Sequence, residues 1–286
     1  MTQNTSPPLK KITLVADFGN SQCKLGRFDD GVFSGSVSIP YNSNSSNSEE
    51  NKANLIGEIS TLLSGVSALY AISVVSEKQQ DAVMALLKKI VKRPLNQVLI
   101  TNKQLSEQIH TSYPLNELGT DRLINVLAGK KTLPDHPFIV IDIGTATTLD
   151  VYCPDNGYLG GLIVPGFHPF WNTLNTTTHK LPAPEIQAVA NPIGQNTHTS
   201  IQRGLALGYV GMLNTLIHDL QTNTGSGLNK PTDEESPQQA PPKVIWTGGS
   251  SSAVLSLAEK LGHTLPCDHH DDTLTLKGIY QSTFIH

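Results

Sequence analysis

The chain has 286 residues, with 20 lysines and arginines against 24 aspartates and glutamates and a formal net charge of −4. This length suits two domains, and the charge excludes a broadly basic surface for nucleic acid or anionic membranes. No apolar run approaches the roughly 20 residues of a membrane-spanning helix, and the polar N-terminus has no hydrophobic signal core. We therefore expect a cytoplasmic globular protein without nucleic-acid or membrane partners.

The three cysteines, Cys23, Cys153 and Cys267, are scattered and form no Cys-x-x-Cys pair. An odd number at such spacings indicates neither a disulfide framework nor a zinc knuckle. This cysteine usage is typical of a reducing compartment, which agrees with the cytoplasmic expectation.

Strands and helices alternate along the chain. Apolar runs predict strands at 12–16, 25–39 (a weaker signal), 68–75, 97–101, 138–144, 147–153, 158–166 and 243–249. Helical spacing of apolar residues and end signals predict helices at 77–93, 121–129, 197–221 and 251–261. Two segments, the Ser/Asn-rich 41–51 and the Pro/Gly-rich acidic 222–243, have too few apolar residues to form a core, and we expect flexible surface loops there.

The two halves of the chain repeat one feature. "VADFGNS" at 15–21 resembles "VIDIGTA" at 140–146, and each begins on an apolar strand and ends in Asp-x-Gly. This long-range repeat predicts two related α/β domains with a cleft between them.

The Asp-x-Gly turns are suited to binding phosphates. Glycine permits a tight reversal, after which backbone N–H groups and Ser or Thr hydroxyls can point at phosphoryl oxygens. Asp17 would be repelled by phosphate, so its presence implies an intervening Mg²⁺ with its water shell. Lys24 would add positive charge. A single copy would be read as an Asx turn between hairpin strands, but two copies in separate halves favour phosphate binding.

A third strand end, "VIWTGGSSS" at 244–252, places Thr-Gly-Gly before a helix that begins with serines. Paired glycines let a flat ring such as adenine lie against the backbone. Alone, the segment is more typical of a plain strand-to-helix turn. Together, the three turns predict a nucleotide held between two domains.

These features resemble the actin, sugar kinase and Hsp70-type ATPase superfamily and, more narrowly, the type III pantothenate kinases. The similar segments occur in the family's order: "DFGNSQCK" (17–24), "LGTDR" (118–122), "DIGTATT" (142–148), "GGLIVPG" (160–166), "GQNTHTSIQRG" (194–204) and "TGG" (247–249). The resemblance implies an α/β fold with two ribonuclease H-like domains, residues 10–120 and 121–286, and a nucleotide cleft between them.

The resemblance also implies an activity. ATP would phosphorylate the primary hydroxyl of pantothenate, the first step of coenzyme A biosynthesis. Asp121 would be the general base, although an N-cap of helix 121–129 is the alternative from position alone. Arg122 would clamp the pantothenate carboxylate through a two-pronged contact, the alternative being a surface ion pair.

The remaining site residues follow from the same resemblance. Asp142 would bind a monovalent cation, K⁺ or NH₄⁺, with a second Mg²⁺-directed aspartate as the alternative. Thr197 would contact substrate, with a helix N-cap as the alternative. The other implied substrate contacts are Tyr113, Gly119 and Thr120. The implied ATP contacts are Asp17, Phe18, Gly19, Asn20, Ser21, Gln22, Cys23, Lys24, Thr145, Gly248 and Gly249. A homodimer is implied as well.

Rival interpretations remain open at this point. A sugar or amino-sugar kinase would keep all three turns but would need several hydroxyl-reading side chains instead of an arginine clamp. A non-catalytic nucleotide-binding accessory protein would keep the fold without transfer. The segment "CDHHDD" (267–272) matches no standard zinc spacing, and we expect a solvated acidic loop there.

Overall fold

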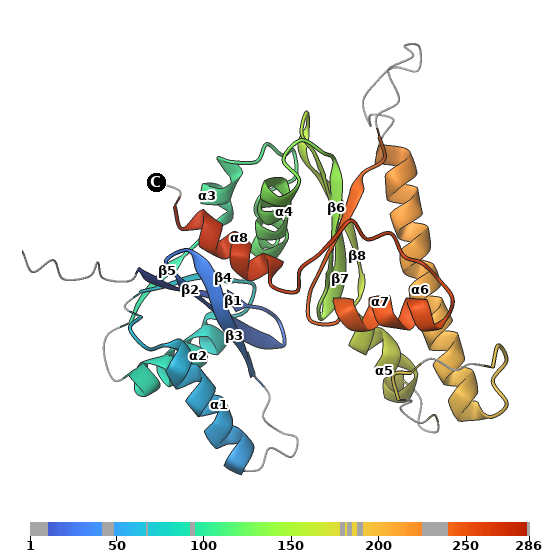
Figure 1. Cartoon of the computed structure of the whole chain (residues 1–286), viewed down its shortest axis with the longest axis horizontal. Helices are drawn as coiled ribbons and strands as arrows, with labels where there is room; N and C mark the ends of the chain where they lie inside the picture. Colours follow the sequence, from blue (N-terminus) through green and yellow to red (C-terminus); the bar gives the residue numbers. More distant parts are fainter. Residues whose placement is uncertain are drawn as a thin grey trace, which may run out of the picture. The chain divides into compact units, whose positions relative to one another are not determined.

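The computed structural model describes residues 11–41, 49–66, 68–91, 95–177, 181, 185–187, 191–224 and 240–284. The chain divides into two compact units, each of which contains one five-stranded sheet (Figure 1). The first unit comprises Met1–Leu105, Leu118–Ile124 and Thr275–His286, and the second comprises Ser106–Glu117 and Asn125–Leu274.

The sheet of the first unit has the order β3-β2-β1-β4-β5. Its strands are β1 (Ile12–Phe18), β2 (Gln22–Asp29), β3 (Val32–Pro40), β4 (Ala68–Ser73) and β5 (Asn96–Leu99). The first three strands are antiparallel, whereas β4 and β5 run parallel to β1. A two-residue turn at Asp30 and Gly31, with φ of 50° and 90°, joins β2 to β3, so the weaker predicted strand 25–39 is a hairpin of two strands.

Helices cover both faces of this sheet. Apolar residues of α1 (Glu49–Leu62) and α2 (Glu77–Val91) pack on the face that carries Leu14, Ala16 and Phe18. On the opposite face, α8 (Leu274–Ser282) stacks Tyr280 on Phe28 with ring centroids 4.0 Å apart. The short α3 (Asn102–Ser106) follows β5.

The sheet of the second unit has the order β10-β9-β6-β7-β8, which is the same arrangement read from the other edge. Its strands are β6 (Phe138–Ile143), β7 (Ala146–Cys153), β8 (Gly157–Pro165), β9 (Lys243–Thr247) and β10 (His269–His270). Again the first three are antiparallel and the last two are parallel to the first. The internal repeat predicted from two short segments is therefore a repeat of whole sheets.

The core of the second unit lies on one face of this sheet. Side chains of β6, β7 and β9 pack against α5 (Phe167–Thr177), α6 (Thr197–Thr224) and α7 (Ser251–Lys260), with Trp171, Tyr209 and Trp246 fully buried among them. Strand alternation therefore places Asp142 and Thr247 on the opposite face, because their neighbours Ile141, Ile143 and Trp246 face this core.

The division between the units passes through α4 (Thr120–Thr132), because residue 124 belongs to the first unit and residue 125 to the second. The units are discontinuous in sequence, unlike the two continuous domains expected at 10–120 and 121–286. The C-terminal α8 is grouped almost entirely with the first unit.

The structure also differs from the expected elements at several places. Helix α1 begins at Glu49, so the end of the predicted loop 41–51 is helical, and residues 42–48 lie outside the described residues. Helix α6 extends to Thr224, and residues 225–239 of the second predicted loop also lie outside them. The elements α1, α3, α5, α8 and β10 were not predicted. No helix among the described residues is long and apolar enough to cross a membrane.

Candidate active site

The first Asp-x-Gly turn joins β1 to β2. Asp17 pairs with Lys24 and Phe18 pairs with Cys23 across the two strands, so each pair shares one face of the sheet. Phe18 and Cys23 are fully buried in the first unit's core. Of the predicted ATP contacts, these two can therefore reach a nucleotide only through their backbone, whereas Asp17 and Lys24 project from the opposite face.

Burial raises the pKa of the Cys23 thiol, and the nearby Asp17 charge raises it further. The thiol consequently stays protonated and behaves as a small apolar side chain.

The tip of the first turn is exposed at Asn20 and Ser21. A Cβ added at Gly19 would lie 3.4 Å from the Gln22 carbonyl oxygen and 3.9 Å from Asp17 Oδ2. The carboxylate therefore lies beside the turn.

The second Asp-x-Gly turn, between β6 and β7, is built in the same way. A Cβ added at Gly144 would lie 3.5 Å from the Ala146 carbonyl oxygen and 3.9 Å from Asp142 Oδ1. Thr145 is exposed at the tip, in the place that Asn20 occupies in the first turn. The matching distances show that the repeat extends to the placement of the carboxylate beside each glycine.

Asp142 is held by a residue that was not predicted. The Asn125 side-chain amide, only 1% exposed, donates a hydrogen bond of 2.8 Å to Asp142 Oδ2. A buried polar residue of this kind is normally hydrogen-bonded. The available signal was a lone polar residue within the apolar run "LINVL" of the predicted helix 121–129.

The third turn follows β9 and lies beside the second one. Gly248 has φ of 94°, and a Cβ added there would lie 2.5 Å from the Ile143 backbone nitrogen and would collide with Asp142 Oδ1. The Ser250 N–H also donates to the Ile143 carbonyl oxygen at 3.2 Å. The predicted nucleotide turns at 142–145 and 247–249 are thus adjacent in the second unit, as expected of residues that bind one ligand.

The start of α4 tests the alternative that Asp121 is the N-cap of this helix. The Leu123 N–H donates to the Gly119 carbonyl oxygen, so Gly119 is the N-cap and Asp121 lies within the first turn. Asp121 Oδ1 accepts a 2.9 Å hydrogen bond from the Arg122 N–H, and a Cβ at Gly119 would collide with that same oxygen. The N-cap alternative for Asp121 is therefore wrong.

Arg122 is 5% exposed, which contradicts the alternative of a surface ion pair. Arginine is rarely buried without a specific role because removing its charge from water is costly. Its burial next to Asp121 on the first turn of α4 is compatible with a carboxylate clamp.

Of the other predicted substrate contacts, Thr120 begins α4 in the first unit, whereas Thr197 and Tyr113 lie in the second unit. Thr197 is exposed on the first turn of α6, but Asn196 is the N-cap, since its Oδ1 accepts from the Thr199 N–H at 2.9 Å. The N-cap alternative for Thr197 is wrong as well. Tyr113 is half-buried and packs beside Tyr158, with ring centroids 5.9 Å apart.

Sequence comparison decides the family. A family model described as type III pantothenate kinase matches residues 13–219. The chain belongs to the type III pantothenate kinase family. A relative named type III pantothenate kinase from Persephonella marina is 33% identical over 212 residues, 73% of each chain. Another of the same name from Sulfurihydrogenibium is 31% identical over 215 residues, covering 75% of this chain and 76% of the relative.

A solved structure agrees with the fold. A Campylobacter jejuni protein described as a Baf family transcriptional activator has a TM-score of 0.51 with 16% identity, covering 94% of this chain and 96% of that one. At this identity the similarity supports the fold alone. The structural similarity confirms the predicted α/β class. The family membership confirms the resemblance to type III pantothenate kinases.

The match to the type III pantothenate kinase model ends before β9, so the turn 247–249 lies outside it. The assignment of this turn as a nucleotide contact therefore depends on its geometry. The turn lies beside Asp142, which is inside the matched region.

The carboxylates in both Asp-x-Gly turns fit hard cations, which take oxygen ligands. Thr247 pairs with Asp142 across the sheet, so the two side chains share a face, and the fully buried Thr247 hydroxyl has no hydrogen-bond partner among the described residues. Such an orphaned oxygen beside a carboxylate is compatible with a cation ligand. No three histidine, cysteine or acidic side chains of the described part gather around a metal position.

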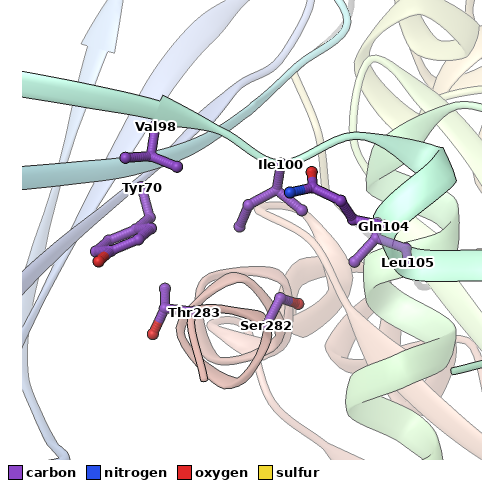
Figure 2. Close-up of a pocket in the computed structure, with 7 residues that line it drawn as sticks. All are labelled: Tyr70, Val98, Ile100, Gln104, Leu105, Ser282 and Thr283. Atoms are coloured by element: carbon purple, nitrogen blue, oxygen red, sulfur yellow. The ribbon is translucent and has the colours of Figure 1, made fainter. Parts of the chain in front are cut away.

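A pocket in the first unit is a separate feature. Figure 2 shows the residues around it, which come from β4, β5, α3, the end of α8 and the positions that directly follow β5 and α8: Tyr70, Val98, Ile100, Gln104, Leu105, Ser282 and Thr283. None of the predicted site residues lines it. Its volume of about 20 Å³ leaves room for little more than a water molecule, which excludes it as a nucleotide site.

Proposed function

We propose that this protein transfers the γ-phosphoryl group of ATP to pantothenate and yields 4′-phosphopantothenate and ADP, the first step of coenzyme A biosynthesis. Family membership carries the choice of substrate. The two Asp-x-Gly turns of matching geometry support the nucleotide half of the reaction.

In this reaction the pantothenate hydroxyl oxygen forms a bond to the γ-phosphorus, and the bond to the bridging β,γ-oxygen breaks. We assign Asp121 as the group that takes the hydroxyl proton. The Arg122 N–H donates a hydrogen bond to Asp121 Oδ1 and holds the carboxylate beside Gly119. We assign the other carboxylate oxygen, Oδ2, as the atom that accepts the proton. Because phosphoryl transfer depends on alignment and charge neutralisation, a carboxylate already held in one orientation suits this role.

Asp17 would hold Mg²⁺ through its water shell, and Asp142 with Thr247 would hold K⁺ or NH₄⁺. These cations would neutralise the negative charge of the phosphates, which is redistributed among the phosphate oxygens during transfer. The exposed turn tips at Asn20, Ser21 and Thr145 would orient the phosphates through hydroxyl, amide and backbone groups.

The direct test is incubation of the purified protein with ATP and pantothenate, with mass spectrometry of the product. One added phosphoryl group and stoichiometric ADP are expected. Turnover of a sugar without turnover of pantothenate would replace this proposal with the sugar kinase alternative. Nucleotide binding without transfer to either would favour the accessory-protein alternative.

We expect Arg122→Lys to raise the KM for pantothenate by about tenfold or more while kcat falls less. Lysine keeps the charge but loses the fork that meets a carboxylate in two hydrogen bonds. Steady-state kinetics with varied pantothenate measures the split.

Arg27→Lys is the matched control, since Arg27 lies in the same unit and its fork binds Asp29 and the Leu62 carbonyl oxygen. It should lower the melting temperature and leave the KM unchanged. An unchanged pantothenate KM in Arg122→Lys would remove the clamp assignment.

We expect K⁺ or NH₄⁺ to activate turnover at matched ionic strength, and Na⁺ to do so poorly. The carboxylate of Asp142, backed by the buried Thr247 hydroxyl, provides the oxygen ligands. Initial rates in the three chloride salts, together with K⁺-dependent shifts of the melting temperature in the presence of ADP, test this. Equal rates and equal shifts in Na⁺ and K⁺ would contradict the role of Asp142.

A homodimer and a cytoplasmic location complete the proposal. Within the homodimer, a second subunit would contribute to the pantothenate pocket. Light scattering coupled to size-exclusion chromatography determines the oligomeric state, and a monomer that is fully active would contradict the dimeric pocket.

A further inference from the structure

The segment 267–272, expected to be a solvated acidic loop, is exposed at Cys267, Asp268, His270 and Asp272, but it is not wholly a loop, because it contains β10. His269 and His270 form β10 and pair with Ile245 and Trp246 of β9. The Asp271 N–H then donates to the Trp246 carbonyl oxygen at 2.9 Å. The segment therefore follows β9 to the point where the Thr247-Gly248-Gly249 turn begins.

Three side chains meet at this point. Ser251 Oγ lies 2.8 Å from His270 Nε2 and 2.5 Å from Asp272 Oδ1, and His270 Nε2 lies 2.9 Å from the same carboxylate oxygen. Because the ionised carboxylate can only accept, Nε2 carries the proton and donates to it. Burial alone raises the pKa of Asp272, but the hydrogen bonds from Ser251, His270 and Ser252 together lower it, so Asp272 is ionised at neutral pH.

The network reaches the turn through Ser251. Its N–H donates to the Gly248 carbonyl oxygen at 3.2 Å, and its hydroxyl, which lies 2.9 Å from that oxygen and 2.5 Å from Asp272 Oδ1, has one proton to share between the two. Gly248 is confined on its other side by the Ile143 backbone and Asp142. The turn is therefore held between β6 and the segment that ends in Asp272.

The same three residue types form hydrolytic triads, but this geometry does not support that chemistry. In a triad the serine and the carboxylate approach different nitrogens of the histidine. Here both approach Nε2, and Ser251 is fully buried at the start of α7, where no substrate can reach it.

We propose that His270 and Asp272 are positioning residues, which hold Ser251 and thereby fix the 247–249 turn in the conformation that accepts the nucleotide. This inference rests on the proposed function, in which Gly248 and Gly249 contact ATP. The network would thus determine affinity for ATP but not for pantothenate.

The experiment compares Asp272→Ala and Ser251→Ala with the unmodified protein. Each removes one member of the network, and we expect each to raise the KM for ATP and the dissociation constant of a non-hydrolysable ATP analogue by roughly tenfold. The KM for pantothenate and kcat should change less than twofold. The double variant should bind the ATP analogue no more weakly than the single variant with the lower affinity, because the two residues act through one contact.

Asp268→Ala is the matched control. Asp268 lies in the same segment and accepts a 2.8 Å hydrogen bond from the Val244 N–H at the opposite end of β9 from the turn. It should lower the melting temperature without changing nucleotide affinity. A merely structural role would lower stability in all three single variants and leave nucleotide affinity equal among them, and that result would overturn the inference.

Calorimetric titration with the ATP analogue separates this inference from the proposed function. Normal binding by the unmodified protein and by Asp272→Ala would refute the positioning role whatever the acceptor substrate is. Tight binding by the unmodified protein without pantothenate turnover would refute the proposed function and leave the positioning role to be decided by the variants.

Discussion

Asp121→Asn is expected to lower kcat by roughly 10²–10⁴-fold, the usual contribution of a general base. Asparagine keeps the side-chain oxygen that accepts from the Arg122 N–H, so the start of α4 should remain intact. It cannot take a proton from the pantothenate hydroxyl. Steady-state kinetics and melting curves on the same preparations measure the two effects separately.

Glu77→Gln is the control for the loss of charge alone. Glu77 is an exposed carboxylate in the first turn of α2, so both variants lose a favourable interaction with a helix dipole, about 0.3–1 kcal/mol. Only Asp121→Asn should lose turnover. Normal kcat in Asp121→Asn would refute the assignment of the base despite the family membership.

Gly248→Ala is expected to lower the free energy of unfolding by about 3 kcal/mol and to weaken ATP binding roughly 100-fold. A left-handed backbone costs about 1–2 kcal/mol for a residue with a Cβ, and the overlap with the Ile143 backbone adds overpacking strain. Relief of that overlap must displace the turn from the position in which it would contact ATP, and a 100-fold loss of affinity corresponds to about 2.7 kcal/mol of binding free energy.

Gly262→Ala separates these contributions. Gly262 has a φ of 77°, close to that of Gly248, but a Cβ added there meets nothing within 4 Å. It should cost about 1 kcal/mol of stability and leave ATP binding unchanged. Denaturant unfolding and titration with an ATP analogue test both variants. Equal losses in the two would show that only backbone strain matters and that the close approach to Ile143 does not.

Local patterns were sufficient for most of the strands and for both Asp-x-Gly turns. Alternating or continuous apolar runs predicted β1, β4 to β9 and the helices α2, α4, α6 and α7 to within a few residues. The elements that were missed have weak local signals. Helix α1 begins in a polar stretch, and β10 consists of two histidines that extend only because β9 offers an edge to pair with.

The candidate site divides in the same way. Asp17, Asp142 and Gly248 could be identified because each directly follows or ends an apolar strand, where local chain geometry restricts the residue type. The surroundings that distinguish the roles of the site residues could not be predicted from the sequence. The burial of Arg122 and the N-caps at Gly119 and Asn196, which exclude the simpler alternatives, depend on atoms that the sequence does not place.

The sequence by itself determined the duplicated Asp-x-Gly turns and the family, because these depend on residue type at fixed short spacing. Only the tertiary structure decided that Asn125 holds Asp142 and that His270 and Asp272 hold Ser251 beside Gly248. Each of these contacts joins residues 17 to 21 positions apart in the chain. Local propensity has no information at that separation, because the contact forms only when strand order brings the end of one element beside the start of another.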